Sequence, residues 1–345
     1  MRVAILGASG YTGLELQRLV LRHPELELVA ITSEQRAGVA AGDAFPALRG
    51  LVDLRFEALD AEALAGRIDV ALCCLPHGAS ARAVGALYRA GVRVVDLAAD
   101  FRLRSLEDYT RWYGEHALPE LIGEAVYGVP ELHREALRGA RLCAAAGCYP
   151  TSALLPLVPF LRAGCVDTTG IVVDAKSGVS GAGRKLDTLY LFGELEANAF
   201  AYKVGGVHRH VPEIEQEASA AAGEAVRISF VPHLIPVTRG MLTTVALRPR
   251  TALGADEARE VLADAWADEP FVRVLPAGET PTLAAVRGTN FCDVAAVMDE
   301  RSGTLVLLCA LDNLGKGASG QMLQCLNVMQ GWPETTGLLQ APLLP

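Results

Sequence analysis

The chain of 345 residues has no apolar segment of the roughly 18 residues that a membrane-spanning helix needs. Its first apolar run ends at a glycine after a few residues, so we expect a β-strand there and not a signal peptide. Lys and Arg, 31 in all, form no cluster and are outnumbered by 40 Asp and Glu, which gives a formal net charge of −9. We therefore expect neither a membrane nor a nucleic acid as partner.

The cysteines are also informative by what they lack. Eight are present, without a CxxC pair and without the spacing of a disulfide-rich domain. Most lie in apolar runs such as DVALCCLP and TLVLLCAL, so we expect reduced, mostly buried thiols and a cytoplasmic protein. The paired histidines His208 and His210 have no third or fourth ligand at a suitable spacing, so no metal site is predicted.

Short apolar runs alternate with helical patterns up to about residue 150, which is typical of a parallel, doubly wound sheet. Longer β-rich runs follow, with one clear helix at residues 255–268 between them and a last helix at 316–331. Strands in succession indicate a mixed or antiparallel sheet. No internal repeat or low-complexity linker is present.

We therefore predict an α/β fold with a Rossmann-type doubly wound parallel sheet and a second α+β domain that holds a large mixed or antiparallel sheet. Residues 1–147 together with 313–345 are expected to form the first of these domains, and residues 148–312 the second.

A glycine loop, GASGYTG, joins the first strand to the first helix. Glycine permits a tight turn and lets a pyrophosphate approach the N–H groups at a helix N-terminus. The alternative is a strand–helix turn that binds nothing, but the β-α-β context favours a dinucleotide. The residues expected to bind the cofactor here are Gly7, Ser9, Gly10, Tyr11, Thr12 and Gly13.

The end of the second strand, ITSEQRAG, bears on which nicotinamide cofactor is used. An acidic residue there would hold the ribose 2′-hydroxyl, whereas an arginine suits a 2′-phosphate. Ser33 stands where the acid would be, and Arg36 can meet a phosphate, although Glu34 has the opposite sign. We therefore predict NADP(H), with Ser33 and Arg36 as cofactor-binding residues.

The stretch AAAGCYPTSALLPLVPF places Cys148 between a glycine and a Tyr-Pro pair, directly before an apolar helical run. A buried structural thiol is the usual fate of a free cysteine. At a helix N-terminus, however, the helix dipole and the N–H groups favour a thiolate and can stabilise an oxyanion. With a dinucleotide fold, such a thiol indicates thioester chemistry coupled to hydride transfer.

That chemistry needs a general base, and VGGVHRHVPEIEQE offers His208 and His210. In a strand the two side chains would face one side. The alternatives are a metal pair or a polar surface turn.

Several motifs occur together and in a characteristic order: GASGYTG, VDLAADFRL, YGVPEL, AAGCYPT, SGVSGAGR, HRHVPEI, PHLIPVTRGM, GTNFCD and DNLGKGASGQMLQ. Over nearly the whole chain, the sequence resembles the N-acetyl-γ-glutamyl-phosphate reductases of arginine biosynthesis, which are related to aspartate-semialdehyde dehydrogenases. The resemblance implies NADPH-dependent reductive dephosphorylation of N-acetyl-L-glutamyl 5-phosphate to the 5-semialdehyde, and a homo-oligomer, either dimer or tetramer.

By matching motif, the resemblance makes Cys148 the nucleophile and a histidine of HRHVPE the acid/base, for which we favour His210 over His208. It assigns Ser177, Gly178 and Gly181 to a loop at the nicotinamide and Asn313 to a cofactor-contacting segment.

Arg102 is the candidate for the acyl phosphate, because the guanidinium fork suits a phosphate; an ion pair with a neighbour such as Asp100 is the alternative. Arg209 and Arg239 are candidates for the substrate carboxylate. The sequence departs from the family's usual serine at Ala98.

Two other functions stay open at this point. One is a sister reductase that acts on an aspartyl phosphate or a carrier-linked aminoadipyl phosphate. The other is a sensor that binds NADP without turnover, because the glycine loop alone permits it; Cys148 and the histidine pair speak against that.

Overall fold

The computed structural model describes residues 1–184 and 186–343. The chain forms two compact units: unit 1 holds Met1–Ala146 and Ala318–Leu339, and unit 2 holds Gly147–Gly317 and residues 340–343. The domain boundaries expected from the sequence, after residues 147 and 312, remain a prediction. Across the described part of the chain, the helices are too short or too polar to cross a membrane.

Unit 1 is built on a seven-stranded sheet, in the described residues, with the order β3-β2-β1-β4-β5-β7-β6. Every neighbouring pair of these strands is parallel. The strands are β1 (Arg2–Leu6), β2 (Glu27–Thr32), β3 (Phe56–Glu57), β4 (Val70–Cys73), β5 (Arg93–Asp96), β6 (Val126–Gly128) and β7 (Leu142–Ala145). The order reverses between β1 and β4, and in such sheets ligands bind beyond the carboxyl ends of the strands at this point. The predicted Rossmann-type sheet is confirmed.

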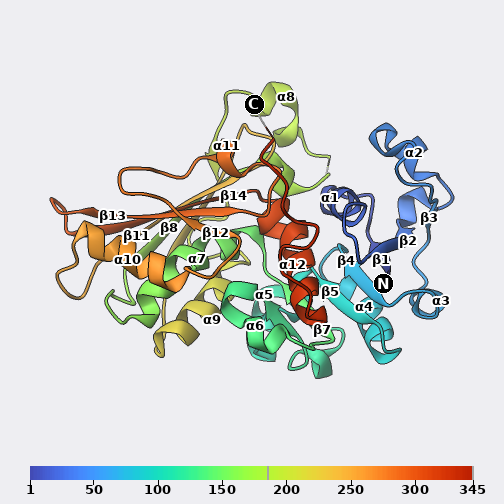
Figure 1. Ribbon diagram of the computed structural model, residues 1–345, viewed down its shortest axis with the longest axis horizontal. Helices are drawn as coiled ribbons and strands as arrows, with labels where there is room; N and C mark the ends of the chain where they lie inside the picture. Colours follow the sequence, from blue (N-terminus) through green and yellow to red (C-terminus); the bar gives the residue numbers. More distant parts are fainter. Residues whose placement is uncertain (185, 344–345) are drawn as a thin grey trace. The chain divides into compact units, whose positions relative to one another are not determined.

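All but the last of the helices of unit 1 connect these parallel strands (Figure 1). The helices of this unit are α1 (Tyr11–Val20), α2 (Ala41–Ala44), α3 (Ala61–Ala65), α4 (Ser80–Arg89), α5 (Leu106–Tyr113), α6 (Pro130–Leu137) and α12 (Gly320–Gln330). Short 3₁₀ turns lie at Glu34–Arg36, Pro46–Leu48, Ala99–Phe101 and Pro119–Leu121. Because β4 and β5 are buried on both faces, they read as continuous apolar runs in the sequence.

Unit 2 contains a mixed sheet with the order β12-β13-β14-β11-β8-β10-β9. Its strands are β8 (Ile171–Gly178), β9 (Phe200–Ala201), β10 (Ile228–Ile235), β11 (Met241–Leu247), β12 (Val272–Val274), β13 (Cys292–Asp299) and β14 (Thr304–Leu311). The pairs β8/β10 and β12/β13 are parallel and the others antiparallel, which confirms the predicted mixed sheet.

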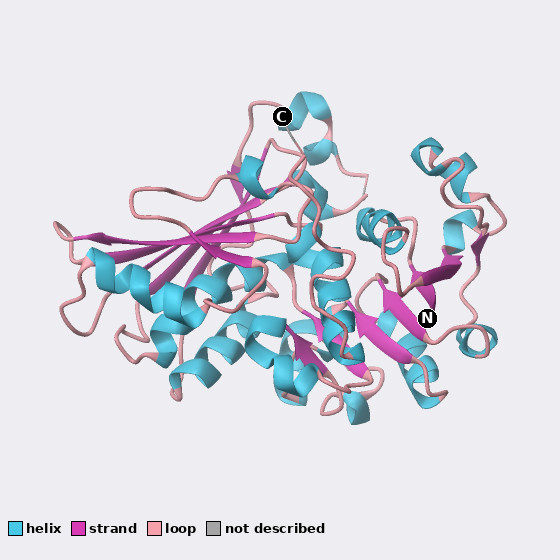
Figure 2. Cartoon of the chain, viewed as in Figure 1, coloured by secondary structure: helices cyan, strands magenta, loops and turns pink. Residues whose placement is uncertain are grey.

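The helices of unit 2 are α7 (Cys148–Arg162), α8 (Phe192–Leu195), α9 (Val211–Ala222), α10 (Ala255–Ala265) and α11 (Leu283–Val286). The 3₁₀ turns are Val179–Ala182 and Thr188–Tyr190, and a π-helical turn spans Gly315–Ser319. Figure 2 shows the long helices of this unit along one face of the sheet, where α7 packs on β11, β13 and β14, and α10 packs on β13.

Helix α7 forms the centre of the core of unit 2, and its residues from Tyr149 to Leu161 are all buried. Two prolines lie inside it, Pro156 and Pro159, although a proline in a helix removes an N–H donor. Pro159 leaves the carbonyl of Leu155 without its helical donor, and the indole Nε1–H of Trp266 donates to that carbonyl at 3.1 Å. The buried carbonyl is thus satisfied by the residue that caps the C-terminus of α10.

Two local expectations need correction. The expected strand around VDLRFEAL contracts to the two residues of β3, because only Phe56 and Glu57 of that run pair with β2. The segment after HRH was not recognised as helical, yet it forms α9, with Pro212 in its first turn. Proline is favoured in the first turn of a helix, so this start signal was present in the sequence.

Candidate active site

The β1–α1 loop requires glycine at two positions. Gly7 has φ +76°, and a Cβ built there would lie 2.6 Å from the carbonyl oxygen of Cys74. A Cβ on Gly13 would lie 2.5 Å from the Cα of Ala8. Gly10, the N-cap of α1, is different, because a Cβ there meets no protein atom closer than the carbonyl oxygen of Gly7 at 3.6 Å.

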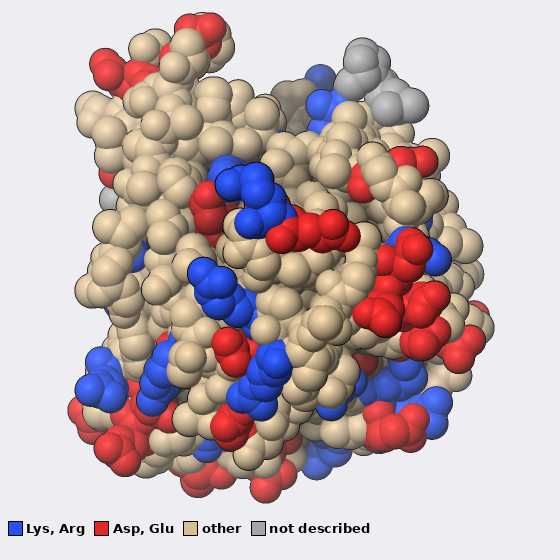
Figure 3. Space-filling view, turned by 90° about the vertical axis from the view of Figure 1, so that its left-hand side faces the viewer, with Lys and Arg blue, Asp and Glu red and all other residues tan. Residues whose placement is uncertain are grey.

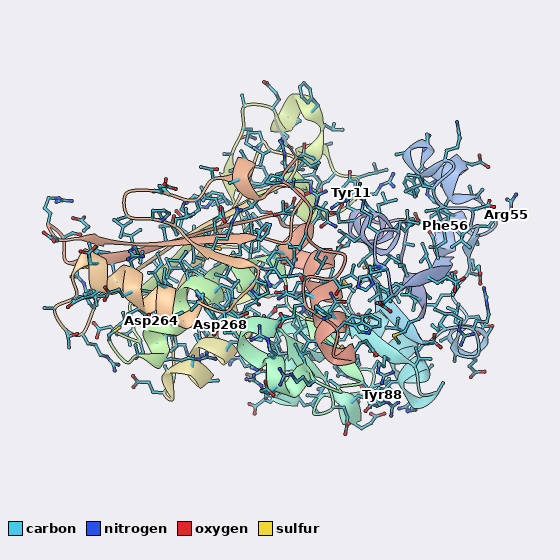
Figure 4. The ribbon with its side chains drawn as sticks, in the orientation of Figure 1. Tyr11, Arg55, Phe56, Tyr88, Asp264 and Asp268 are labelled. Atoms are coloured by element: carbon cyan, nitrogen blue, oxygen red, sulfur yellow. The ribbon has the colours of Figure 1, made fainter. Side chains whose placement is uncertain are left out.

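This loop fits a pyrophosphate. Gly10 has no side chain with which to cap α1, and the positive end of the helix dipole favours an anion at this N-terminus. Tyr11, labelled in Figure 4, opens the helix and is 40% exposed. The carbonyl of Thr12 accepts a hydrogen bond from the Ser319 hydroxyl at 2.9 Å, which joins α1 to the last helix of unit 1.

The end of β2 lies beside this loop. The hydroxyls of Ser9 and Ser33 are 2.8 Å apart, and the guanidinium of Arg36 lies 5.0 Å from the centre of the Phe45 ring. Glu34, the residue of opposite sign, accepts the backbone N–H of Leu59 at 2.8 Å. The acidic group is therefore engaged by the backbone, and these contacts fit an adenosine ribose that carries a 2′-phosphate.

Asp96 ends β5 at the same edge of the parallel sheet and is fully buried. Its Oδ1 accepts the Ser80 hydroxyl at 2.7 Å and the N–H of Ala98 at 3.1 Å. Burial raises the pKa of the Asp96 carboxyl to about 7, against the opposing effect of these two hydrogen bonds. Ala98 therefore contributes its backbone N–H to the loop.

Arg102 follows this loop and is only 4% exposed, so it is not a surface residue. Its Nη2 donates to the carbonyl of Leu97 at 2.7 Å. The carboxylate of Asp100 accepts the N–H of Gly78 at 2.9 Å and the hydroxyl of Tyr109 at 3.1 Å. His77 accepts the N–H of Ala99 on its Nδ1 at 2.9 Å, so it caps this loop.

In unit 2, Cys148 is the first residue of α7 and is partly exposed. Its N-cap, Gly147, has φ −76° and ψ 163°, an extended conformation that turns the chain into the helix. Gly317 packs directly against the cysteine, because a Cβ there would lie 2.7 Å from the Cβ of Cys148. The sulfur thus sits at the positive end of a buried helix, as the sequence predicts.

The histidine pair lies in a turn before α9 and not in a strand, because Gly205 and Gly206, with φ +80° and +77°, turn the chain. His208 packs between the rings of Tyr149, Tyr202 and Phe230. Its Nδ1 accepts the backbone N–H of His210 at 3.1 Å.

Burial lowers the pKa of His208 to about 4, and the charge of Lys203 acts in the same direction. A neutral ring with its Nδ1 committed to a backbone N–H is poorly suited to exchange protons at neutral pH. His210 is the N-cap of α9, and its ring centre lies 5.0 Å from that of His208 and 5.8 Å from that of Tyr149. The assignment of His210 as the acid/base remains a prediction.

Two tyrosines near the cysteine were not predicted. The hydroxyls of Tyr149 and Tyr202 are 2.9 Å apart, and the ionised form of Cys148 disfavours ionisation of both. Burial raises the pKa of Tyr149 well above its usual range and that of Tyr202 to about 12, so both stay neutral. Tyr149 adjoins the cysteine in sequence, a usable signal, whereas Tyr202 is brought near by the fold.

The SGVSGAGR loop is joined to the end of β14. Asn313 donates from Nδ2 to the Ser180 hydroxyl at 2.9 Å and accepts the N–H of Gly240 on Oδ1 at 2.7 Å. A Cβ on Gly181 would lie 2.8 Å from the hydroxyl of Ser177, and one on Gly178 would lie 2.8 Å from the carbonyl of Val237. These predicted cofactor contacts therefore form a tightly packed loop.

The two arginines predicted for the substrate carboxylate differ. Arg239 donates from Nε to the buried carboxylate of Asp312 at 2.9 Å, and the same carboxylate accepts the N–H groups of Leu314 and Gly315. Arg209, between the histidines, is exposed. Arg239 thus has a structural task, and the buried Asp312 that holds it was not among the predicted site residues.

Within residues 1–184 and 186–343, no group of three or more His, Cys, Asp or Glu side chains is arranged to hold a metal ion. On the face drawn in Figure 3, Lys and Arg side chains lie among Asp and Glu, and the described residues form no continuous basic surface there.

The chain is similar to known proteins over its full length. Residues 2–140 match the family model described as semialdehyde dehydrogenase, NAD binding domain, and residues 148–313 match semialdehyde dehydrogenase, dimerisation domain. Proteins named N-acetyl-gamma-glutamyl-phosphate reductase from Citrifermentans bemidjiense and Geotalea daltonii are 47% and 48% identical to it, with 100% of each chain covered. One from Magnetococcus marinus is 47% identical and is covered to 99%.

This chain belongs to the N-acetyl-gamma-glutamyl-phosphate reductase family. The resemblance drawn from the motifs is thereby confirmed.

Solved structures share the fold of this reductase family member. Aspartate semialdehyde dehydrogenase II from Vibrio cholerae, complexed with ASA, has a TM-score of 0.71 at 19% identity, with 95% of this chain and 97% of that chain covered. The aspartate semialdehyde dehydrogenase with NADP from Candida albicans has a TM-score of 0.66 at 17% identity, with 95% and 99% covered. At these identities the likeness concerns the fold.

Proposed function

We propose that this chain reduces N-acetyl-L-glutamyl 5-phosphate to N-acetyl-L-glutamate 5-semialdehyde with NADPH, as a step of arginine biosynthesis. The full-length relatives named N-acetyl-gamma-glutamyl-phosphate reductase support this substrate. The observation that carries the chemistry is the place of Cys148, which starts α7 behind a glycine N-cap and beside the histidine turn.

In the first half-reaction, Sγ of Cys148 gives an electron pair to the acyl carbon of the substrate, and His210 takes the thiol proton. The bond between the acyl carbon and the phosphate oxygen then breaks, so inorganic phosphate leaves and a thioester remains on Cys148. The N–H groups at the start of α7 stabilise the oxyanion, because the helix dipole favours negative charge there. Pro150 supplies no N–H, so Cys148 and Tyr149 are the donors of this turn.

In the second half-reaction, NADPH supplies the hydride that reduces the thioester carbon. The C–S bond then breaks, the semialdehyde leaves, and Cys148 departs as a thiolate that His210 reprotonates. His208 holds the backbone of His210 through its Nδ1 and stays neutral. Tyr149 and Tyr202 remain protonated and can donate hydrogen bonds.

Within this proposal, the residues that hold the cofactor are Gly7, Ser9, Gly10, Tyr11, Thr12, Gly13, Ser33 and Arg36, together with Ser177, Gly178, Gly181 and Asn313. Arg36 meets the 2′-phosphate, and Arg102 meets the acyl phosphate through its planar fork. Arg209 is preferred to Arg239 for the substrate carboxylate, because the Nε of Arg239 is held by Asp312.

We also propose a homo-oligomer of cytoplasmic location. Val172 and Val297, which are 38% and 43% exposed, lie on strands of the mixed sheet in the unit that matches a dimerisation domain. The eight cysteines are free thiols, which suits a reducing compartment. Light scattering of the purified protein tests the oligomer, and fractionation of producing cells tests the location.

The reverse reaction tests the proposed activity. N-acetylglutamate semialdehyde, phosphate and NADP should yield NADPH, whose absorbance is followed. The Cys148→Ser variant should be inactive and the matched Cys165→Ser variant active, because Cys165 contacts the carbonyl of Phe160 at the far end of α7. A protein that prefers aspartate semialdehyde, or that binds NADP and turns over neither, would contradict the proposal.

A further inference from the structure

A buried carboxylate links the two helices that carry the proposed nucleophile and base. Glu213 lies in the first turn of α9 and is 1% exposed. Its Oε1 accepts the backbone N–H of Gly147, the N-cap of α7, at 3.2 Å. The two residues are 66 positions apart in the sequence, so the bond joins separate segments of unit 2.

A second helix of the same unit shows what this bond replaces. Helix α10 also begins after a glycine N-cap, Gly254, with φ −78° and ψ 165°, close to the −76° and 163° of Gly147. The N–H of Gly254 is accepted at 2.8 Å by the side chain of Glu257, three residues later in its own helix. This is the carboxylate half of a capping box.

In α7 the corresponding third position is Pro150, which has no carboxylate. Helix α9 therefore supplies to α7 the carboxylate that α10 obtains from its own first turn. The supplying turn is also the one that His210 caps, since His210 precedes Val211 and Glu213 lies three residues further along. One side chain thus fixes the start of α9 to the start of α7.

We propose that Glu213 is a positioning residue, which holds Cys148 in register with His210 by accepting the N–H of Gly147. This rests on the proposed function only for the roles of Cys148 and His210. A thiol in register with the imidazole loses its proton to it at a lower pH than a thiol that has moved away. The N–H groups at the start of α7 keep their direction for the same reason.

The test compares three variants. Glu213→Gln keeps an acceptor oxygen and loses the charge, whereas Glu213→Leu removes the acceptor. Glu217→Leu is the matched control, because Glu217 is a buried carboxylate one turn further along α9. Circular dichroism and the thermal midpoint establish which variants are folded.

The first readout needs no substrate. The rate of iodoacetamide modification of Cys148 is followed against pH by mass spectrometry. Glu213→Leu should shift the midpoint of this profile to higher pH and slow modification at pH 7 about tenfold, whereas Glu213→Gln and Glu217→Leu should keep the wild-type profile. An unshifted profile in Glu213→Leu overturns the proposal, and so does a Glu213→Gln profile shifted as far as that of Glu213→Leu.

The second readout is turnover. Glu213→Leu should lower kcat about tenfold to a hundredfold while KM for NADP changes less than about twofold, because misplacement of a reacting group affects the chemical step. An equal loss in Glu217→Leu would overturn the proposal, since any buried carboxylate of α9 would then do the same. If the wild type proves inactive on the proposed substrate while the alkylation profiles follow the expectation, the proposed function fails and the role of Glu213 stands.

Discussion

Two strand-to-helix junctions, β1–α1 and β7–α7, use almost the same backbone for different chemistry. Gly10 has φ −78° and ψ 168°, and Gly147 has φ −76° and ψ 163°. Neither glycine has a side chain that could cap its helix, and the positive end of each helix dipole favours an anion there. The difference is the next residue, which is Tyr11 in α1 and Cys148 in α7. In the proposed function, the first junction receives the cofactor, and the second adds a cysteine as the nucleophile.

The two units also bury ionisable groups of opposite kind. In unit 1 burial raises the pKa of Asp96 to about 7, and in unit 2 burial lowers the pKa of His208 to about 4. Both are neutral near pH 6. In each unit, burial disfavours the charged form of one ionisable group. That charge would be negative on Asp96 and positive on His208.

The largest effect is expected where the junctions differ most. Cys148→Ser should lower turnover by at least about a thousandfold, because serine is a far weaker nucleophile at this position. NADP binding, measured by titration calorimetry, should stay within about twofold of the wild type, because the junction that holds it is intact. Near-normal turnover in this variant would reduce α7 to a structural helix, and Cys165→Ser serves as the control.

The second prediction concerns pH and stability. The pKa of Asp96 is higher in the folded protein than in the unfolded chain. Its contribution to the free energy of unfolding is therefore full below about pH 4 and is lost as the pH rises to about 7, a change of roughly 4 kcal/mol. The pKa of His208 is lower in the folded protein than in the unfolded chain. Its contribution to the free energy of unfolding is therefore full above about pH 6.5 and is lost as the pH falls toward 4, a change of roughly 3 kcal/mol. The two slopes oppose each other in the wild type.

Asp96→Asn should therefore uncover the slope of His208, and the urea midpoint should rise with pH between about 4.5 and 6.5 more steeply than in the wild type. Asp53→Asn, which removes an exposed carboxylate, should leave the profile of the wild type. Parallel profiles for wild type and Asp96→Asn would mean that Asp96 is ionised in the folded protein at all these pH values.

The third prediction separates two roles of glycine within the first junction. Gly13→Ala should lower the free energy of unfolding by about 1–3 kcal/mol, because its Cβ would lie 2.5 Å from the Cα of Ala8. Gly10→Ala should unfold like the wild type, yet bind NADPH about tenfold more weakly, because its Cβ would stand before the first-turn N–H groups. Undiminished NADPH affinity in Gly10→Ala would remove the pyrophosphate from this junction.

The smallest effect is expected at the edge of the cofactor site. Arg36→Ala should weaken NADPH by about 1.5 kcal/mol and leave NADH nearly unchanged, because only NADPH carries the 2′-phosphate. Arg55→Ala is a suitable control, because this nearby arginine donates to the carbonyl of Gly38. Equal weakening of both cofactors would assign Arg36 a structural role against Phe45.

Local patterns predicted the elements whose signals lie within a few residues. The glycine loop follows β1 as expected, and Cys148 begins α7 because Gly147, the proline of the first turn and the apolar run together specify a helix start. Helix α9 was not predicted, although Pro212 in its first turn is a helix start signal. Its boundary was readable from sequence.

Contacts between segments that are far apart in the sequence could not be predicted from such local patterns. Glu213 in α9 meets Gly147, and Tyr202 meets Tyr149, only after the sheet of unit 2 has formed. No periodicity encodes a bond across 66 positions. The commitment of Arg239 to Asp312 likewise depends on tertiary packing, so the sequence could not separate Arg209 and Arg239 as candidates for the substrate carboxylate.

The bond between Trp266 and Leu155 has a consequence for how the protein is made. These residues are 111 positions apart, and synthesis proceeds from the N-terminus. On the ribosome, all residues of α7 are synthesised before the indole that satisfies its inner carbonyl has been added. Helix α7 therefore acquires its final hydrogen bonding late, when α10 docks. In a chain truncated before Trp266, the carbonyl of Leu155 would lose its indole donor, and Cys148 would lie on a helix whose hydrogen bonding is incomplete.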